Sequence, residues 1–164
     1  MGVNVAERRK TNLADRSVSW LLCRLGAHLC ALPLAHVTEI MRPLPIEPIG
    51  GAPHFVLGLA IVRGAPIPVV STALLVGERG NETQRWVTLR VGGRNVVLAV
   101  DSVLGVSTLD AALGNELPPL LKDAASEVVL AIGTLDAELL LFLNAARIVP
   151  MAMQEGIVQQ VPET

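Results

Sequence analysis

Few of the side chains that usually perform chemistry are present, and their spacing matches no catalytic or metal-binding pattern. The residues able to bind a metal or exchange a proton near neutral pH are three histidines and two cysteines: His28, His36, His54, Cys23 and Cys30. The histidines are separated by 8 and 18 residues, which fits no zinc motif. Asp101 and Asp136 have no evident carboxylate partner for paired acid–base catalysis. We therefore expect no enzyme activity, no metal site and no cofactor.

Three other positions carry residue types that are unusual in apolar runs, and two of them, Arg63 and Glu39, are candidate contacts with another protein. Arg63 follows the apolar run 58–62 and precedes Gly64, so a glycine bend can present its guanidinium to a carboxylate. Glu39 alternates with apolar residues, and it either faces solvent as in an ordinary strand or contacts a partner. Gly58 interrupts an apolar strand, so either the backbone bulges there or another group approaches too closely for a Cβ.

Composition excludes several classes of partner. The 164-residue chain is 51% hydrophobic, 17% charged and 2% aromatic, with a net charge of −2. These values disfavour a base-stacking surface and a basic face for nucleic acid. No apolar run reaches the roughly 20 residues of a membrane span, and the basic cluster 8–10 lacks the apolar stretch of a signal peptide, so we expect a cytoplasmic protein. The apolar excess indicates either a large aliphatic core or a surface covered by partners.

Short apolar runs separated by Gly and Pro predict an all-β fold. The predicted strands are 18–25, 28–34, 36–42, 56–62, 66–70, 85–91, 94–100, 102–107, 127–133 and 138–143. Two-residue turns at 26–27, 92–93 and 136–137 join three pairs of these strands as hairpins. The first turn places Cys23 opposite Cys30, either as a reduced buried pair or as a redox switch.

An internal repeat divides the chain into two related β units, about 18–80 and 85–150. Residues 25–40 align with 91–106 at an offset of 66, and residues 69–76 align with 142–149 at an offset of 73, so the second unit has seven extra residues within 107–127. Each unit closes with a short helical turn, which begins at a cap (Ser71 or Asn144) and ends at Gly77 or Pro150. We expect one domain over 17–150, flanked by mobile tails at 1–16 and 151–164.

The order of motifs resembles the CheW family. It comprises L-G-A-x-L-x-A-L-P-L-x-x-V-x-E-I over 25–40, G-A-P-x-F-V-x-G over 51–58, V-R-G-A-x-I-P-V-V over 62–70 and V-L-A-V-D-S-V over 97–103. The resemblance covers about residues 18–150. It implies two intertwined, SH3-like, five-stranded β-barrel subdomains packed around a shared hydrophobic core. It also implies a non-catalytic adaptor that joins the regulatory domain of a CheA-type histidine kinase to the cytoplasmic tips of chemoreceptors.

By position, the resemblance assigns receptor contact to Val37, Gly58 and Arg63, and it places Glu39 near the kinase side. The alternative function is an accessory regulator or sensor that binds a small apolar ligand in a cleft between the barrels.

Two departures from the family pattern indicate a divergent member. Ile61 stands where the family commonly has Asn, and it removes an amide that can order the bend or meet the receptor. Ser71 stands where the family commonly has Asp, but it keeps a side-chain oxygen for the helix cap.

Overall fold

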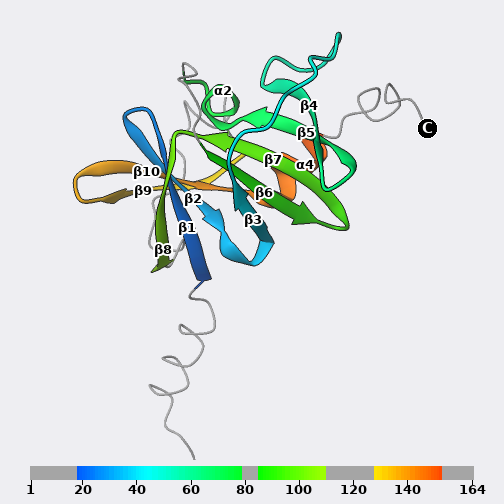
Figure 1. Cartoon of the computed structure of the whole chain (residues 1–164). Coiled ribbons are helices and arrows are strands. Elements are labelled where there is room, and N and C mark those ends of the chain that lie inside the picture. Colours follow the sequence, from blue (N-terminus) through cyan, green and yellow to red (C-terminus); the bar gives the residue numbers. More distant parts are fainter. Residues whose placement is uncertain (1–17, 79–84, 110–127, 153–164) are drawn as a thin grey trace, which may run out of the picture.

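The computed structural model describes residues 18–78, 85–109 and 128–152, which Figure 1 shows as coloured ribbons. The strands of these ranges are β1 (Val18–Leu25), β2 (His28–Pro33), β3 (Val37–Met41), β4 (Val56–Val62), β5 (Ala65–Ser71), β6 (Arg85–Val91), β7 (Arg94–Val100), β8 (Ser102–Leu109), β9 (Val129–Leu135) and β10 (Glu138–Leu143). They are joined by a 3-10 turn, η1 (Leu34–His36), and two helices, α2 (Thr72–Leu75) and α4 (Ala145–Ala152). Every predicted strand is confirmed, with ends that differ by at most two residues. The predicted tail 1–16 and residues 110–127 of the predicted insertion lie outside the described residues.

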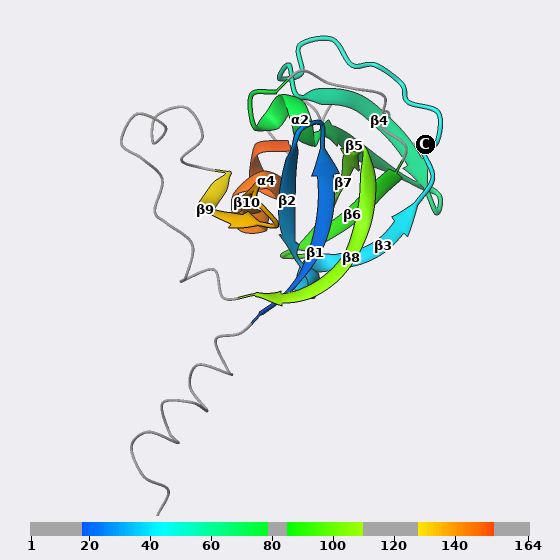
Figure 2. The ribbon, with the colours of Figure 1, turned by 90° about the vertical axis from the view of Figure 1, so that its left-hand side faces the viewer.

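The strands form two five-stranded sheets, which we call the first barrel and the second barrel. The first barrel has the order β8-β1-β2-β10-β9, and the second has the order β3-β6-β7-β5-β4. Each barrel therefore combines one hairpin from one half of the sequence with three strands from the other half (Figures 1 and 2). This corrects the predicted boundaries, because the units 18–80 and 85–150 are the repeat in the sequence and not the barrels.

The exchange of strands follows from hairpins that are apolar on both faces. Residues 20–23 of β1 and 96–100 of β7 are all buried, although successive side chains of a strand point to opposite faces. One face of each hairpin packs inside its own barrel and the other packs against the opposite barrel. Both faces are covered when β3 continues from the first hairpin to pair with β6, and β8 continues from the second hairpin to pair with β1.

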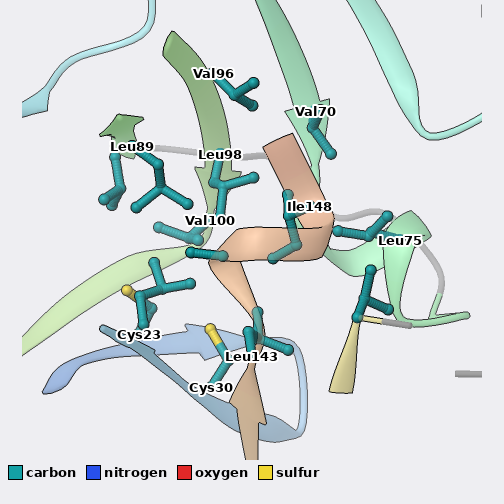
Figure 3. Close-up of a cluster of buried hydrophobic side chains, with 14 of the residues drawn as sticks. Cys23, Cys30, Val70, Leu75, Leu89, Val96, Leu98, Val100, Leu143 and Ile148 are labelled. Atoms are coloured by element: carbon teal, nitrogen blue, oxygen red, sulfur yellow. The ribbon is translucent and has the colours of Figure 1, made fainter. Parts of the chain in front are cut away.

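Buried side chains form three clusters. One cluster fills the first barrel, where the rings of Trp20 and Phe142 meet edge to face with centroids 5.1 Å apart. A second cluster fills the second barrel around Trp86. The largest lies between the barrels, where Figure 3 shows the two cysteines and Ile148 among valines and leucines. This is the shared core that the CheW resemblance implies.

The predicted two-residue turns are confirmed, and they set the register of the hairpins. The turn after β1 places Cys23 opposite Cys30, and both thiols are free and buried. The turn between β9 and β10 is formed by Asp136 and Ala137, whose φ angles of 51° and 64° are unusual for residues other than glycine.

The first of the two short helices is as predicted. The Ser71 hydroxyl accepts a hydrogen bond of 3.3 Å from the backbone N–H of Leu74, so the substitution of the family's Asp keeps the helix cap. The chain leaves α2 through Gly77, whose φ is 85°.

The second helix is longer than predicted. It continues through Pro150 to Ala152, which is fully buried in the shared core and therefore does not belong to the predicted tail 151–164. Pro150 lies on the exposed face, so the carbonyl that it leaves without a donor can bind water. Neither helix in the described part of the chain is long and apolar enough to cross a bilayer.

Candidate functional site

One end of the second barrel opens as a groove that charged, polar and apolar side chains line together. On β6, Trp86, Thr88 and Arg90 share the face that points into the barrel; Trp86 and Thr88 are buried, and Arg90 is exposed. The groove has a volume of about 430 Å³, and we call it the mouth of the second barrel. All five strands and the β4–β5 turn contribute to its lining: Thr38, Glu39, Val62, Arg63, Ala65, Ile67, Thr88, Arg90 and Asn95.

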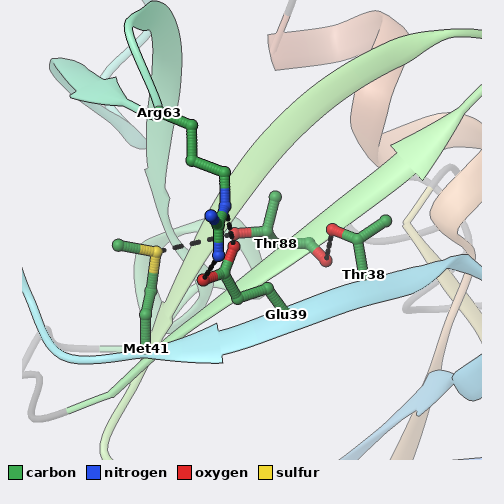
Figure 4. A network of polar contacts seen from close by, with 5 residues as sticks. All are labelled: Thr38, Glu39, Met41, Arg63 and Thr88. Atoms are coloured by element: carbon green, nitrogen blue, oxygen red, sulfur yellow. Dashed lines mark hydrogen bonds and ion pairs between the residues drawn. The ribbon is translucent and has the colours of Figure 1, made fainter.

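Arg63 and Glu39 form a bidentate ion pair across this mouth (Figure 4). Arg63 Nη2 donates to Glu39 Oε1 at 2.7 Å, and Arg63 Nε donates to Oε2 at 3.1 Å. Arg63 occupies the two-residue turn between β4 and β5 with a φ of 51°, followed by Gly64 with a φ of 81°. The Arg63 side chain is 77% exposed and that of Glu39 is 29% exposed, so a partner can reach the pair. The sequence flagged both residues, but it did not predict that they bind each other.

The ion pair is charged at neutral pH. The hydrogen bonds and charge of Arg63 lower the pKa of Glu39, against a smaller opposing effect of burial. The same contact raises the pKa of Arg63. The pair therefore persists until the pH falls through the lowered pKa of Glu39.

A break in strand register turns Glu39 toward the mouth. Val37 pairs with Leu89 and Glu39 pairs with Thr88, so the register shifts between Val37 and Glu39. The Thr38 hydroxyl donates to the Thr88 carbonyl at 3.2 Å and fixes this shift. Val37 itself is half-buried and packs against the shared core.

Gly58 does not line the mouth of the second barrel. The backbone of the same chain explains why this position is a glycine. It is buried in β4 with a φ of 148°, and a Cβ there would lie 2.2 Å from the carbonyl oxygen of Glu47. Glu47 exchanges two backbone hydrogen bonds with Leu59, of 2.7 and 2.9 Å, which hold it over Gly58. The register also shifts between Val56 and Gly58. The close approach that the sequence left open is therefore made by the chain's own backbone, so no partner is needed to explain this glycine. The receptor contact that the resemblance assigns to Gly58 stays a prediction.

Two hydrophobic side chains near the ion pair are exposed. Ile61 on β4, where the family commonly has Asn, is 63% exposed, and Ile40 on β3 is 46% exposed. Both alternate with side chains that point into the second barrel, so they lie on its outer surface and add apolar area beside the strands that carry the ion pair.

The histidines and aspartates considered as metal ligands or acid–base groups do not form a cluster. His28 is paired with Glu78, and the His54 ring meets the Phe55 ring edge to face. Asp101 accepts a hydrogen bond of 2.7 Å from the Gly26 backbone N–H and supports the first hairpin turn. Within 18–78, 85–109 and 128–152, no three His, Cys, Asp or Glu residues lie close enough to hold a metal ion.

Sequence reasoning missed Arg90 and Asn95, which face each other on β6 and β7 and line the mouth. The repeat is a signal that could have found Arg90, but not Asn95, which aligns with Leu29. Arg90 aligns with Arg24 at the offset of 66, and Arg24 forms its own bidentate ion pair with Glu138, with distances of 3.1 and 3.0 Å.

Comparison with known proteins identifies the family. Residues 19–153 match the CheW-like domain. The chain belongs to the CheW family. It is 24% identical over 143 residues to "Chemotaxis protein CheW" of Klebsiella aerogenes, a match that covers 84% of this chain and 86% of that protein.

A solved CheW structure has the same fold. The scaffolding protein TtCheW from Thermoanaerobacter tengcongensis superposes with a TM-score of 0.67 at 22% identity, over 78% of this chain and 89% of that one. CheW-family proteins are scaffolds in chemotaxis signalling. The two SH3-like barrels and the CheW resemblance inferred from the sequence are therefore confirmed.

Proposed function

We propose that this chain is a non-catalytic cytoplasmic adaptor that couples chemoreceptors to the regulatory domain of a CheA-type histidine kinase. The observation that carries this proposal is the exposed Arg63–Glu39 ion pair at the mouth of the second barrel. Both residues stand at positions that the family resemblance assigns to partner contacts. A guanidinium held rigidly by a carboxylate is preorganised to meet a partner, since little side-chain freedom remains to be lost on binding.

The pairing also links the two partner assignments. The resemblance places Arg63 on the receptor side and Glu39 on the kinase side, yet their side chains share two hydrogen bonds. A partner that displaces one of these residues changes the position of the other. We therefore infer that receptor and kinase binding are coupled through this ion pair.

The sensor alternative has no observation in its favour. A small apolar ligand between the barrels would have to displace the buried side chains of the shared core, such as Leu98 and Ile148. The groove that is open lies instead at the mouth of the second barrel, and its lining includes the charged side chains of Glu39, Arg63 and Arg90.

Binding to a receptor cytoplasmic fragment tests the proposal. Arg63→Ala is expected to weaken binding about tenfold in isothermal titration, because it removes an exposed charge-assisted contact. Its melting temperature should stay within about 2 °C of the wild type, since an exposed ion pair contributes little to folding.

Arg24→Ala is the matched control, because it also breaks a bidentate ion pair between arginine and glutamate, but one that lies in the first barrel. It should leave receptor binding unchanged. Equal losses for the two variants, or no loss for Arg63→Ala, would contradict the proposed receptor face. Glu39→Gln should weaken binding of both the receptor fragment and the kinase regulatory domain, because Glu39 orients Arg63 and is itself placed on the kinase side.

A further inference from the structure

The two barrels carry an equivalent arginine at the same end of their interiors. Arg24 on β1 and Arg90 on β6 are related by the offset of 66. Arg24 lies two residues after Leu22, and Arg90 lies two residues after Thr88; both of these earlier side chains face a barrel interior. Each arginine therefore lies at the end of a barrel interior, where it meets solvent. The two arginines therefore have the same structural setting, and their surroundings can be compared directly.

Their carboxylate partners differ. Arg24 is bound by Glu138, the first residue of β10. The offset of 73 relates Glu138 to Ala65, the first residue of β5, which also lines the mouth of the second barrel. Ala65 has no charge to offer, and the guanidinium of Arg90 forms no side-chain hydrogen bond or ion pair with the described residues.

The mouth of the second barrel consequently has one positive charge in excess. Among the described residues that line the mouth, Arg63 and Glu39 neutralise each other, which leaves the guanidinium of Arg90 without an opposite charge. Asn95, opposite Arg90 on β7, adds a side-chain amide, and the hydroxyl of Thr38 lies on the same rim. A volume of about 430 Å³ is ample for a carboxylate side chain.

We propose that the mouth of the second barrel receives a Glu or Asp side chain from the protein partner that docks at Arg63, and that Arg90 binds its carboxylate with the Asn95 amide beside it. The partner thereby supplies in trans the carboxylate that Glu138 supplies in cis to the first barrel. The identity of this partner as the receptor fragment rests on the proposed function, whereas the chemistry of the site does not.

Ala65→Glu tests the proposal by supplying the missing carboxylate within the chain. Ala65 is exposed, so the longer side chain has room to reach Arg90 as Glu138 reaches Arg24. The variant should fold and should bind the receptor fragment about tenfold more weakly, because the site is already filled. Ala65→Gln, which has the same shape without charge, should weaken binding clearly less than Ala65→Glu, because it cannot form an ion pair with Arg90.

Removal of the arginine gives the complementary result. Arg90→Gln should weaken binding about tenfold, and in that background Ala65→Glu should cause no further loss, because both changes act on one contact. Equal weakening by Ala65→Glu and Ala65→Gln would indicate steric exclusion and overturn the proposal. Unchanged binding in both Ala65→Glu and Arg90→Gln would overturn it as well, while leaving the proposed adaptor function intact.

A second measurement does not depend on the receptor. A glutamate-containing helical peptide, titrated into the isotope-labelled full chain, should shift the NMR resonances of Arg90 and Asn95. A peptide with glutamine in place of glutamate should not, and neither peptide should shift them in Ala65→Glu.

The two measurements separate the two proposals. Shifts with the acidic peptide but no binding of the receptor fragment by the wild-type chain would refute the adaptor function and retain the carboxylate site. No shifts with the acidic peptide, together with no binding of the receptor fragment, would overturn both. Shifts with acetate equal to those with the peptide would indicate a small-anion site in place of a protein contact.

Discussion

Gly58 is required by the backbone of its own chain. The Glu47 carbonyl oxygen fills the place of a Cβ, at 2.2 Å from where that atom would lie. Gly105 on β8 has a nearly identical φ, 145° against 148°, but a Cβ there would meet nothing within 4 Å. The two glycines thus share the same backbone strain and differ only in the close approach.

Substitution of these two glycines separates strain from steric clash. We expect Gly58→Ala to lower the free energy of unfolding by about 2 kcal/mol more than Gly105→Ala, because only the first forces the segment around Glu47 away from β4. Urea denaturation of both variants measures the difference. Equal effects would show that the strained φ alone requires glycine at both positions.

Cys23 and Cys30 act as core residues. Both are fully buried, and the hydrogen bond with Cys23, followed by burial, raises the pKa of the Cys30 thiol well above its usual value. A thiolate is the reactive form of cysteine, so this environment argues against the redox switch that the sequence left open. The residue equivalent to Cys30 in the repeat is Val96, which is buried in the same cluster.

The raised pKa predicts a loss of stability at alkaline pH. The unfolded chain releases the Cys30 proton near its ordinary pKa of about 8.5, whereas the folded chain retains it, so folding is weakened as the pH rises above that value. Cys30→Val should cost less than about 1.5 kcal/mol at pH 7 and should lose less stability than the wild type between pH 7 and 10. Parallel losses in the two proteins would contradict a protonated thiol in the fold.

At the scale of elements, hairpin turns set the register that brings the site together. The turn of Arg63 and Gly64 returns the chain from β4 to β5 and places the guanidinium at the mouth of the second barrel. Its equivalent between β9 and β10 uses Asp136 and Ala137, both at positive φ. Alanine is strained in that conformation, and glycine is not.

Ala137→Gly is therefore expected to stabilise the protein, although glycine usually destabilises a strand or helix. The expected gain is about 0.5–1 kcal/mol, since the relief of left-handed strain exceeds the greater flexibility of the unfolded chain. Ala99→Gly in β7, where the chain is extended, should instead be destabilising. A lower melting temperature for Ala137→Gly would mean that the turn in solution differs from the one described.

At the scale of the whole molecule, the barrels depend on strands exchanged between the two halves of the chain. β2 runs parallel to β10, and β5 runs parallel to β7, so neither repeat can complete a barrel by itself. Helix α4 packs on β6 and β7, and it buries Ala145, Ile148, Val149 and Ala152 in the shared core. The end of this helix is thus part of the domain.

Two truncations locate the C-terminal boundary of the domain. A chain that ends after Ala152 keeps the whole buried stripe of α4, whereas one that ends after Val149 loses the last turn and the fully buried Ala152 side chain. We expect the shorter chain to melt at least about 4 °C below the longer one, because this loss opens a cavity in the core. Equal melting temperatures would restore the boundary at 150 that the sequence indicated.

The sequence by itself determined the strands, the hairpin turns, the repeat and the family. Each of these depends on local chemistry or on order along the chain: alternating apolar residues, glycines that permit positive φ, and motifs in a fixed succession. The facing of Cys23 and Cys30 followed from a turn length alone. Arg63 and Glu39 were singled out as polar residues beside apolar runs, whereas Val37 was assigned only through the resemblance to the CheW family.

Contacts between distant segments were decided only by the tertiary structure. The exchange of strands, the parallel pairings, the approach of Glu47 to Gly58 and the pairing of Arg63 with Glu39 join residues that no local pattern relates. The sequence predicted a helix end at Pro150, because proline removes a backbone hydrogen bond of the helix. The burial of Ala152 in the shared core outweighs that local cost. Which distant residues contact one another depends on which apolar faces pack together. That packing is a property of the complete fold.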